Sequence, residues 1–195
     1  MTPWKEYEKA KAFFLRANEE FVRSARNLFD MGVSEQCLCG GLMNQMNILN
    51  FAEKSYLGYY ADVEYNRNSA NAEKRYKKSI QDREGQVINI TCDIILHSRG
   101  RYIQRDNILA VEMKKESKEE KYASDRNRLR SLTSPTYNGE APGYIGIHLP
   151  IYVCRYALGV FYIISRDFKE VHLEYYKDGE RIDEDTIILS DLWEG

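Results

Sequence analysis

An acid and a lysine at the end of an apolar run form the pattern in this sequence that is most suggestive of chemistry. The run NILAVEMKK at Asn107–Lys115 contains Glu112 and, two residues later, Lys114. Side chains alternate between the two faces of a strand, so we expect these two groups on the same face. Charges that emerge from a buried strand need compensation, either by each other or by a metal ion. The similar triplets at 116–118 and 119–121 lack this setting, because they lie in a charged, helix-forming stretch.

A second acid, Asp93, precedes another apolar run at 94–96. If this segment pairs as a hairpin with the one that holds Glu112, the two carboxylates lie within about 6 Å of each other. Neighbouring carboxylates repel unless a cation lies between them, and oxygen ligands suit Mg²⁺ or Mn²⁺. We therefore predict a metal site at Asp93 and Glu112. Lys114 would then polarise the scissile phosphate or assist the attacking water.

Several segments, taken in chain order, carry a family resemblance. DVEYNR at 62–67, DIILHSRG at 93–100 and NILAVEMKK at 107–115 resemble segments of a group of small proteins in the PD-(D/E)XK nuclease superfamily. The later part of the chain is similar to the same group at Asp125, Leu129, Leu132, Thr133 and the strand-like run 159–164. The resemblance covers about residues 35–165, and Cys92 stands where the family motif has a proline, which changes no ligand.

This resemblance implies a restriction-endonuclease-like core, with a mixed four-stranded sheet flanked by helices, and Mg²⁺-dependent cleavage of phosphodiester bonds. It also implies that Glu35 is an additional acid contributed to the site by a helix. An acid in the first turn of a helix is favoured by the helix dipole without any function, so a structural role stays open for Glu35. Glu53 shares the predicted helix face and is the alternative candidate for this additional acid. We interpret Glu64 as a positioning or surface residue.

The charge of the chain is unevenly distributed. Residues 66–130 contain 16 Lys and Arg against 10 Asp and Glu, a surplus of six positive charges, whereas residues 178–195 contain seven acids and one arginine. The basic middle suits contacts with phosphates, for which the candidates are Arg99, Arg101, Arg105 and Arg128. A solvated charged surface is the alternative for each of them. His97 is a candidate general base, although a lone histidine at a strand end is more often structural.

Length and composition predict one α/β (α+β) domain. The 195 residues are 43% hydrophobic, which is enough for a sizeable core. We expect N-terminal helices over 1–54, a core that carries the catalytic strands over 59–165, and a C-terminal β-hairpin-like extension over 166–195.

Hydrophobic periodicity predicts the elements within these parts. We expect helices at 3–29, with one break, at 35–54 after the cap Ser34, and at 118–132. The expected strands are 59–66, 87–97, 107–115, 157–165, 172–176 and 186–189, with a turn at 177–179. The polar segment 67–86 is expected to leave the sheet, and 134–156 to form a long loop.

No stretch of the sequence is apolar for long enough to span a membrane, and residues 1–16 are charged throughout, so we expect a cytoplasmic protein without membrane contact. The four cysteines are too few and too scattered for a disulfide framework. Cys37 and Cys39 have no second pair at a matching spacing, which argues against a zinc site.

The residues and the resemblance together favour a Mg²⁺-dependent nuclease, with DNA as the preferred substrate and a second copy of the chain as a candidate partner. One alternative is a catalytically inactive protein of the same fold that binds nucleic acid or a protein. Another is an interaction protein whose acidic tail contacts a basic partner; a salt-dependent affinity that maps to residues 178–195 would identify it.

Overall fold

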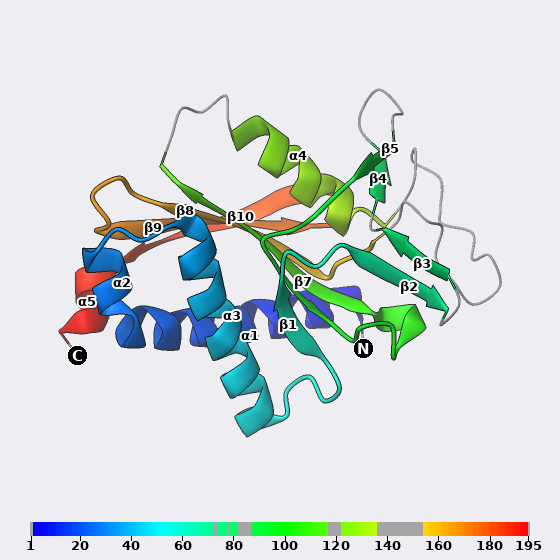
Figure 1. Ribbon diagram of the computed structural model, residues 1–195, viewed down its shortest axis with the longest axis horizontal. Coiled ribbons are helices and arrows are strands. Elements are labelled where there is room, and N and C mark those ends of the chain that lie inside the picture. Colours follow the sequence, from blue (N-terminus) through cyan, green and yellow to red (C-terminus); the bar gives the residue numbers. More distant parts are fainter. Residues whose placement is uncertain are drawn as a thin grey trace.

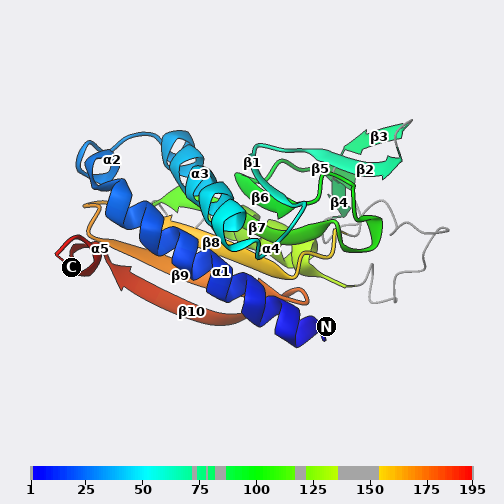
Figure 2. The ribbon, with the colours of Figure 1, turned by 90° about the horizontal axis from the view of Figure 1, so that it is seen from below.

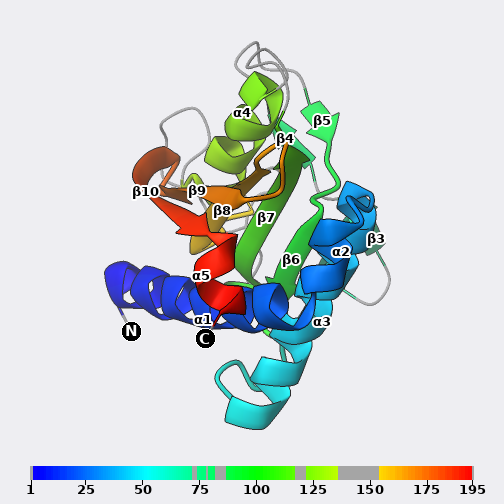
Figure 3. The ribbon, with the colours of Figure 1, turned by 90° about the vertical axis from the view of Figure 1, so that its left-hand side faces the viewer.

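The computed structural model describes residues 2–71, 74–77, 79–81, 87–116, 122–135 and 154–194. Within them, a six-stranded mixed sheet is covered by helices on both faces (Figure 1). Helices α1 (Pro3–Ser24) and α3 (Glu35–Glu53) lie against one face and α4 (Tyr122–Thr133) lies against the other, so the sheet is the middle layer (Figure 3). The prediction of an α/β (α+β) fold is confirmed at this level.

The N-terminal helices form because the sequence supplies both an apolar stripe and caps. Thr2 caps α1 by accepting a hydrogen bond from the first turn, and a proline follows it. The predicted break falls at Ala25, after which α2 (Arg26–Asp30) continues. Ser34 caps α3, as predicted. α1 and α3 cross one sheet face together (Figure 2), and a Cβ on Gly41 would lie 2.6 Å from a ring carbon of Phe21, so only glycine permits this close approach.

The strands of the large sheet are, in spatial order, β1 (Tyr60–Val63), β6 (Ile94–His97), β7 (Asn107–Lys115), β8 (Leu158–Ile164), β9 (Glu170–Lys177) and β10 (Glu180–Ile188). All neighbours are antiparallel except β7 and β8. A parallel pair requires a crossover connection, and α4 lies within it. The predicted number of four strands is wrong, because both strands of the C-terminal extension join the same sheet.

The C-terminal hairpin turns at Asp178 and Gly179, whose φ angles are 51° and 86°. Two successive positive φ angles are the property of a type I′ turn, which Asp-Gly favours. The prediction of a short strand at 186–189 is wrong, since β10 already begins at Glu180. The first half of β10 is exposed and charged, as suits a strand at a sheet edge, and it therefore lacks the apolar pattern used to find strands. The short helix α5 (Leu189–Trp193) follows.

The segment before β6 departs from the prediction of one strand over 87–97. β5 (Val87–Asn89) pairs with β4 (Ser79–Gln81) in a separate ribbon, and the chain joins the large sheet only at Ile94. β2 (Arg67–Asn71) and β3 (Lys74–Lys77) form another ribbon. The described residues of the segment 67–86 therefore lie outside the large sheet, as expected, although they form strands. Asp93 lies at the junction where the chain enters β6.

Helix α4 lies close to the sheet because β8 has a glycine beneath it. A Cβ on Gly159 would lie 3.0 Å from Thr133 Cγ2 and 3.3 Å from Leu129 Cδ2, so a larger residue would push α4 away. The same helix buries Leu132 in the smaller of the two hydrophobic clusters. This packing fixes the distance between α4 and the polar end of β7.

Two predicted segments extend beyond the described residues. The helix expected at 118–132 is described from Tyr122 onward, and 117–121 lie outside the described part. Most of the loop expected at 134–156 also lies outside it, because residues 136–153 are not described. Among the described helices, none has both the length and the apolar character needed to cross a membrane.

Candidate active site

The register of β6 and β7 directs Asp93 toward Glu112. Ile94, the first residue of β6, pairs with Val111, and continuing this antiparallel register by one residue would set Asp93 opposite Glu112. Opposite residues of an antiparallel pair point to the same face, with Cβ atoms about 4.5–5.5 Å apart. Asp93 Oδ2 also accepts a hydrogen bond of 2.7 Å from the backbone N–H of Met113. Burial raises the pKa of Asp93, and that hydrogen bond and Lys114 oppose the rise.

Glu112 is an almost completely buried acid, and only one of its two carboxyl oxygens accepts a hydrogen bond from the described residues. The residue is 2% exposed, and its Oε2 accepts a hydrogen bond of 2.8 Å from Arg128 Nη1. Its other oxygen, Oε1, has no hydrogen-bond partner among the described residues. Burial raises the pKa of Glu112 to about 8, since the attraction of Arg128 offsets only part of that effect and the charge of Asp93 adds to it. The positive charge of Arg128 therefore compensates the ionised carboxyl group only in part.

Lys114 lies two residues further along β7 and stays charged. Its Nζ is 3.6 Å from Asp125 Oδ2 and 4.0 Å from Glu35 Oε2. Burial lowers the pKa of Lys114, but the attraction of Asp125, Glu35 and Asp93 outweighs burial, and the pKa is raised. The side chain is partly exposed, so the ammonium group can reach a ligand that approaches from solvent.

Glu35 reaches the same place from the first turn of α3. Its Oε1 accepts a hydrogen bond of 3.0 Å from the backbone N–H of Lys115, which fixes the helix start to the end of β7. The alternative candidate Glu53 lies at the opposite end of α3 and pairs with Arg16 at 2.6 Å. Glu64 is exposed and accepts a hydrogen bond from a glutamine side chain.

Two further members of the site come from α4. Asp125 is nearly buried, with Oδ1 3.5 Å from Arg128 Nη1 and Oδ2 next to Lys114. From the sequence, Asp125 was expected only as part of the family resemblance, and Arg128 was predicted to contact nucleic acid. The signal that could have placed them here is the three-residue spacing of an acid and an arginine in the helix that follows β7. We call Glu35, Asp93, Glu112, Lys114, Asp125 and Arg128 the acidic cluster.

The other three arginines predicted to bind nucleic acid lie elsewhere. Arg99, Arg101 and Arg105 belong to the loop after β6, at the end of that strand opposite Asp93. Four strand residues at about 3.3 Å each separate the two ends by roughly 13 Å or more. Arg105 forms an ion pair with Glu6, and Arg101 lies near the ring of Tyr102. Of the four predicted arginines, only Arg128 joins the acidic cluster.

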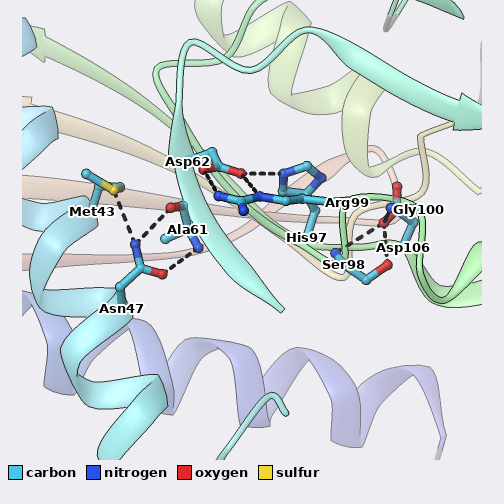
Figure 4. A network of polar contacts seen from close by, with 9 residues as sticks. All are labelled: Met43, Asn47, Ala61, Asp62, His97, Ser98, Arg99, Gly100 and Asp106. Carbon is cyan, nitrogen blue, oxygen red and sulfur yellow. Dashed lines mark hydrogen bonds and ion pairs between the residues drawn. The ribbon is translucent and has the colours of Figure 1, made fainter. Parts of the chain in front are cut away.

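The loop after β6 is organised by two aspartates (Figure 4). Asp62 Oδ2 lies 2.9 Å from His97 Nε2, and the guanidinium of Arg99 donates to both oxygens of the same carboxylate. Asp106 accepts hydrogen bonds from Ser98 and from the backbone N–H of Gly100. His97 is fully buried and lies at the end of β6 remote from Asp93, which favours the structural interpretation of this residue.

The acidic cluster was compared with the needs of a metal ion. In the part of the chain that the structure describes, no three His, Cys, Asp or Glu side chains form a group suited to hold a metal. Mg²⁺ is usually held by one or two carboxylates, with water and substrate phosphates as its other ligands. The pair Asp93 and Glu112 fits this smaller requirement, and the unpartnered Oε1 of Glu112 is a buried oxygen that a cation would satisfy.

Comparison with known proteins gives no relative. No model of a protein family matches the chain, and no match is found among curated proteins or among solved structures. A functional conclusion therefore depends on the acidic cluster itself.

Proposed function

We propose that this chain is a Mg²⁺-dependent nuclease of the PD-(D/E)XK type, with a restriction-endonuclease-like core and DNA as its favoured substrate. One observation carries the proposal: among the described residues, Oε1 of the buried acid Glu112 has no hydrogen-bond partner, and the register of β6 and β7 directs Asp93 toward this acid. A buried carboxylate without sufficient compensation costs several kcal/mol, and a bound cation removes this cost. The proposal includes a cytoplasmic location and pairing with a second copy.

The charges of the acidic cluster support a divalent cation. Its four carboxylates face two cationic groups, so the fully ionised cluster carries two excess negative charges. One Mg²⁺ or Mn²⁺ neutralises them. A bound ion would also polarise the phosphate and lower the pKa of an attacking water.

Each residue then has a defined task. Asp93 and Glu112 hold the ion. Lys114 directs its ammonium group toward the phosphate and stabilises the negative charge that develops during cleavage. Glu35 pairs with this lysine and also holds the backbone at the end of β7, so it positions the strand that carries both catalytic side chains.

The proposal is tested by incubating the purified protein with single-stranded DNA, double-stranded DNA and RNA in Mg²⁺, Mn²⁺ or EDTA. We expect metal-dependent cleavage that EDTA stops. Asp93→Asn should abolish cleavage and weaken Mg²⁺ binding measured by calorimetry, because an amide cannot balance the charge of the cation. Glu53→Gln, which changes an acid at the far end of α3, is the matched control and should cleave normally. Wild-type protein that binds no Mg²⁺ and cleaves none of these substrates would contradict the proposal.

A catalytically inactive protein of the same fold, which binds nucleic acid or a protein partner, is the second candidate. The observation that favours it is the contact of Arg128 with Glu112, since a guanidinium already supplies one positive charge where a metal is proposed. Nucleic-acid binding that Mg²⁺ does not change, without cleavage, would select this candidate.

A further inference from the structure

Arg128 contacts the same carboxylate that is proposed to hold the metal ion. Its Nη1 donates to Glu112 Oε2 at 2.8 Å, while Glu112 Oε1 remains without a hydrogen-bond partner in the described part of the chain. Mg²⁺ demands near-ideal octahedral geometry and close oxygen ligands. A guanidinium that holds one of the two oxygens of Glu112 therefore opposes full access of the ion to this acid.

A second acceptor for the same guanidinium is already present. Asp125 Oδ1 lies 3.5 Å from Arg128 Nη1, within the same helix and one turn earlier. A small displacement would exchange Glu112 for Asp125 without leaving the arginine unpaired. After this exchange the guanidinium would still have a nearly buried counter-charge, because Asp125 is 5% exposed.

Arg128 also has access to solvent that Glu112 lacks. Its side chain is 27% exposed, compared with 2% for the side chain of Glu112. A guanidinium has five N–H donors in a planar fork, and this geometry matches the oxygens of a phosphate. The arginine can therefore contact a ligand from solvent with donors that the acidic cluster does not use.

We propose that Arg128 is an internal counter-ion that Mg²⁺ displaces from Glu112 to Asp125, and that the displaced guanidinium binds the scissile phosphate. The inference rests on the proposed function, because it needs a metal at Glu112. Asp125 is the positioning residue in this scheme, since it holds Arg128 and Lys114 on its two oxygens. Arg128 thereby offsets part of the negative charge of the cluster before the metal arrives, and a phosphate-binding group becomes available once the metal is in place.

Arg126 provides an internal control for this exchange. It lies two residues away on α4 and also pairs with a buried acid, Glu174, to which it donates from Nε to both oxygens at 3.1 and 3.0 Å. Arg181 Nη1 donates to the same carboxylate at 3.1 Å. Glu174 has no open oxygen for a cation, so Arg126 should stay in place when Mg²⁺ binds.

The experiment follows the guanidinium groups of the full chain by nuclear magnetic resonance. Protein labelled with ¹⁵N-arginine is titrated with Mg²⁺, and the Nε–Hε signals of Arg128 and Arg126 are assigned from Arg128→Lys and Arg126→Lys. We expect the Arg128 signal to move by more than its line width, with the same midpoint as Mg²⁺ binding measured by calorimetry. The Arg126 signal should stay within its line width. Inorganic phosphate should then move the Arg128 signal again, but only when Mg²⁺ is present.

Glu112→Gln keeps the test valid if an arginine variant fails to fold. Without Mg²⁺, this variant should already show an Arg128 signal close to the metal-bound position of the wild type, because an amide does not hold the guanidinium as a carboxylate does. Mg²⁺ binding without movement of the Arg128 signal, or with equal movement of Arg126, overturns this inference and leaves the nuclease proposal standing. Absence of Mg²⁺ binding overturns both. A phosphate titration that leaves Arg128 unchanged overturns its role as a phosphate ligand.

Discussion

Two buried glutamates on the same face of the sheet hold arginines from the same helix, yet their surroundings differ. Glu112 on β7 pairs across the parallel strands with Phe161, which in turn pairs with Glu174 on β9. The two acids therefore lie in one row, and both are covered by α4. Arg128 contacts the first acid and Arg126 the second.

Glu174 is fully satisfied. Both oxygens accept from Arg126, one also accepts from Arg181, and the other accepts from the hydroxyl of Tyr176 at 2.6 Å. Burial acts to raise the pKa of Glu174, but the hydrogen bonds of Arg126 and Tyr176 outweigh it, and the pKa is lowered. This acid fixes α4 and β10 to the sheet.

Glu112 has one arginine contact, its other oxygen has no hydrogen-bond partner in the described part of the chain, and its pKa is raised. Equal burial therefore does not mean an equal role. A buried charge that is fully compensated by hydrogen bonds and opposite charges stabilises the fold. A buried charge that is only partly compensated is a candidate for binding and catalysis.

Exchanging each glutamate for glutamine should give opposite results. Glu112→Gln should abolish cleavage with little loss of stability, because Arg128 can turn to Asp125. Glu174→Gln should lower the free energy of unfolding by about 3–5 kcal/mol, because it leaves two arginines without a buried counter-charge. Mg²⁺ affinity of the folded Glu174→Gln protein should be unchanged. Denaturant unfolding, calorimetry and cleavage assays measure these effects, with Glu170→Gln, an exposed position of β9, as control. If both substitutions reduced cleavage equally, the two acids would not differ in role as proposed.

Lys114→Ala should reduce the cleavage rate by roughly 10² to 10³, the usual loss for one preorganised electrostatic group. Mg²⁺ binding should be kept or slightly tightened, since the ammonium group repels the cation. Lys115→Ala is the matched control, because the neighbouring lysine donates to the backbone carbonyl of Gly32 instead of facing the acidic cluster. Single-turnover rates and calorimetry distinguish the two effects. A Lys114→Ala protein that loses Mg²⁺ binding together with cleavage would point to a structural role.

The two glutamates should give opposite dependences of stability on pH. The pKa of Glu112 rises from an ordinary 4.5 to about 8 on folding, so the folded state binds the proton more tightly. Its contribution to stability is therefore complete below pH 4.5 and is lost as the pH rises toward 8, by at most about 1.4 kcal/mol per pH unit. Glu174 has a lowered pKa, so its contribution is present above the ordinary value and is lost as the pH falls through the folded value.

Unfolding experiments over pH 4–9 measure the slope of Glu112, and their extension to lower pH measures that of Glu174, whose folded pKa lies below the ordinary 4.5. Glu112→Gln should remove the loss of stability between about pH 4.5 and 8, and saturating Mg²⁺ should reduce it in the wild type. Glu174→Gln should leave that slope in place. The description of Glu112 as a partly compensated acid would be contradicted if the free energy of unfolding of the wild type rose between pH 4.5 and 8 and the Glu112→Gln protein showed the same slope.

The sequence predicted β7 to the residue, because an uninterrupted apolar run with charges at its end leaves little choice of boundaries. The antiparallel pairing of β6 and β7 also followed from the sequence, since two neighbouring apolar runs were predicted to form a hairpin. The extent to which positive charges compensate each glutamate did not follow from it. Arg126 lies 48 residues from Glu174 in the chain, and only the packing of α4 brings it to this acid. Arg181 follows Glu174 by seven residues and reaches it across the hairpin of β9 and β10, whose second strand was predicted too short to include this arginine. Edge strand β10 was shortened in the prediction because solvent exposure removes the apolar signal.

Substitutions in the loop after β6 should have the smallest effect on nucleic-acid affinity. They test whether this loop contacts phosphates. Arg101 is exposed there, whereas Arg99 is held by Asp62, so charge reversal of Arg101 disturbs the fold less. If the loop contacts a phosphate of duplex DNA, Arg101→Glu should weaken binding and reduce the slope of log affinity against log salt by about 0.9 for one lost contact. Arg99→Glu should act in the same direction.

Lys169→Glu makes the same charge change on an exposed residue between β8 and β9 and should leave the slope unchanged. The affinities are measured by fluorescence anisotropy of a labelled duplex at several salt concentrations, in EDTA so that no cleavage occurs. A slope that Arg101→Glu does not alter would assign the loop to the solvated surface. Phosphate binding would then centre on Arg128 and Lys114, and the substrate would approach the sheet from the α4 side alone.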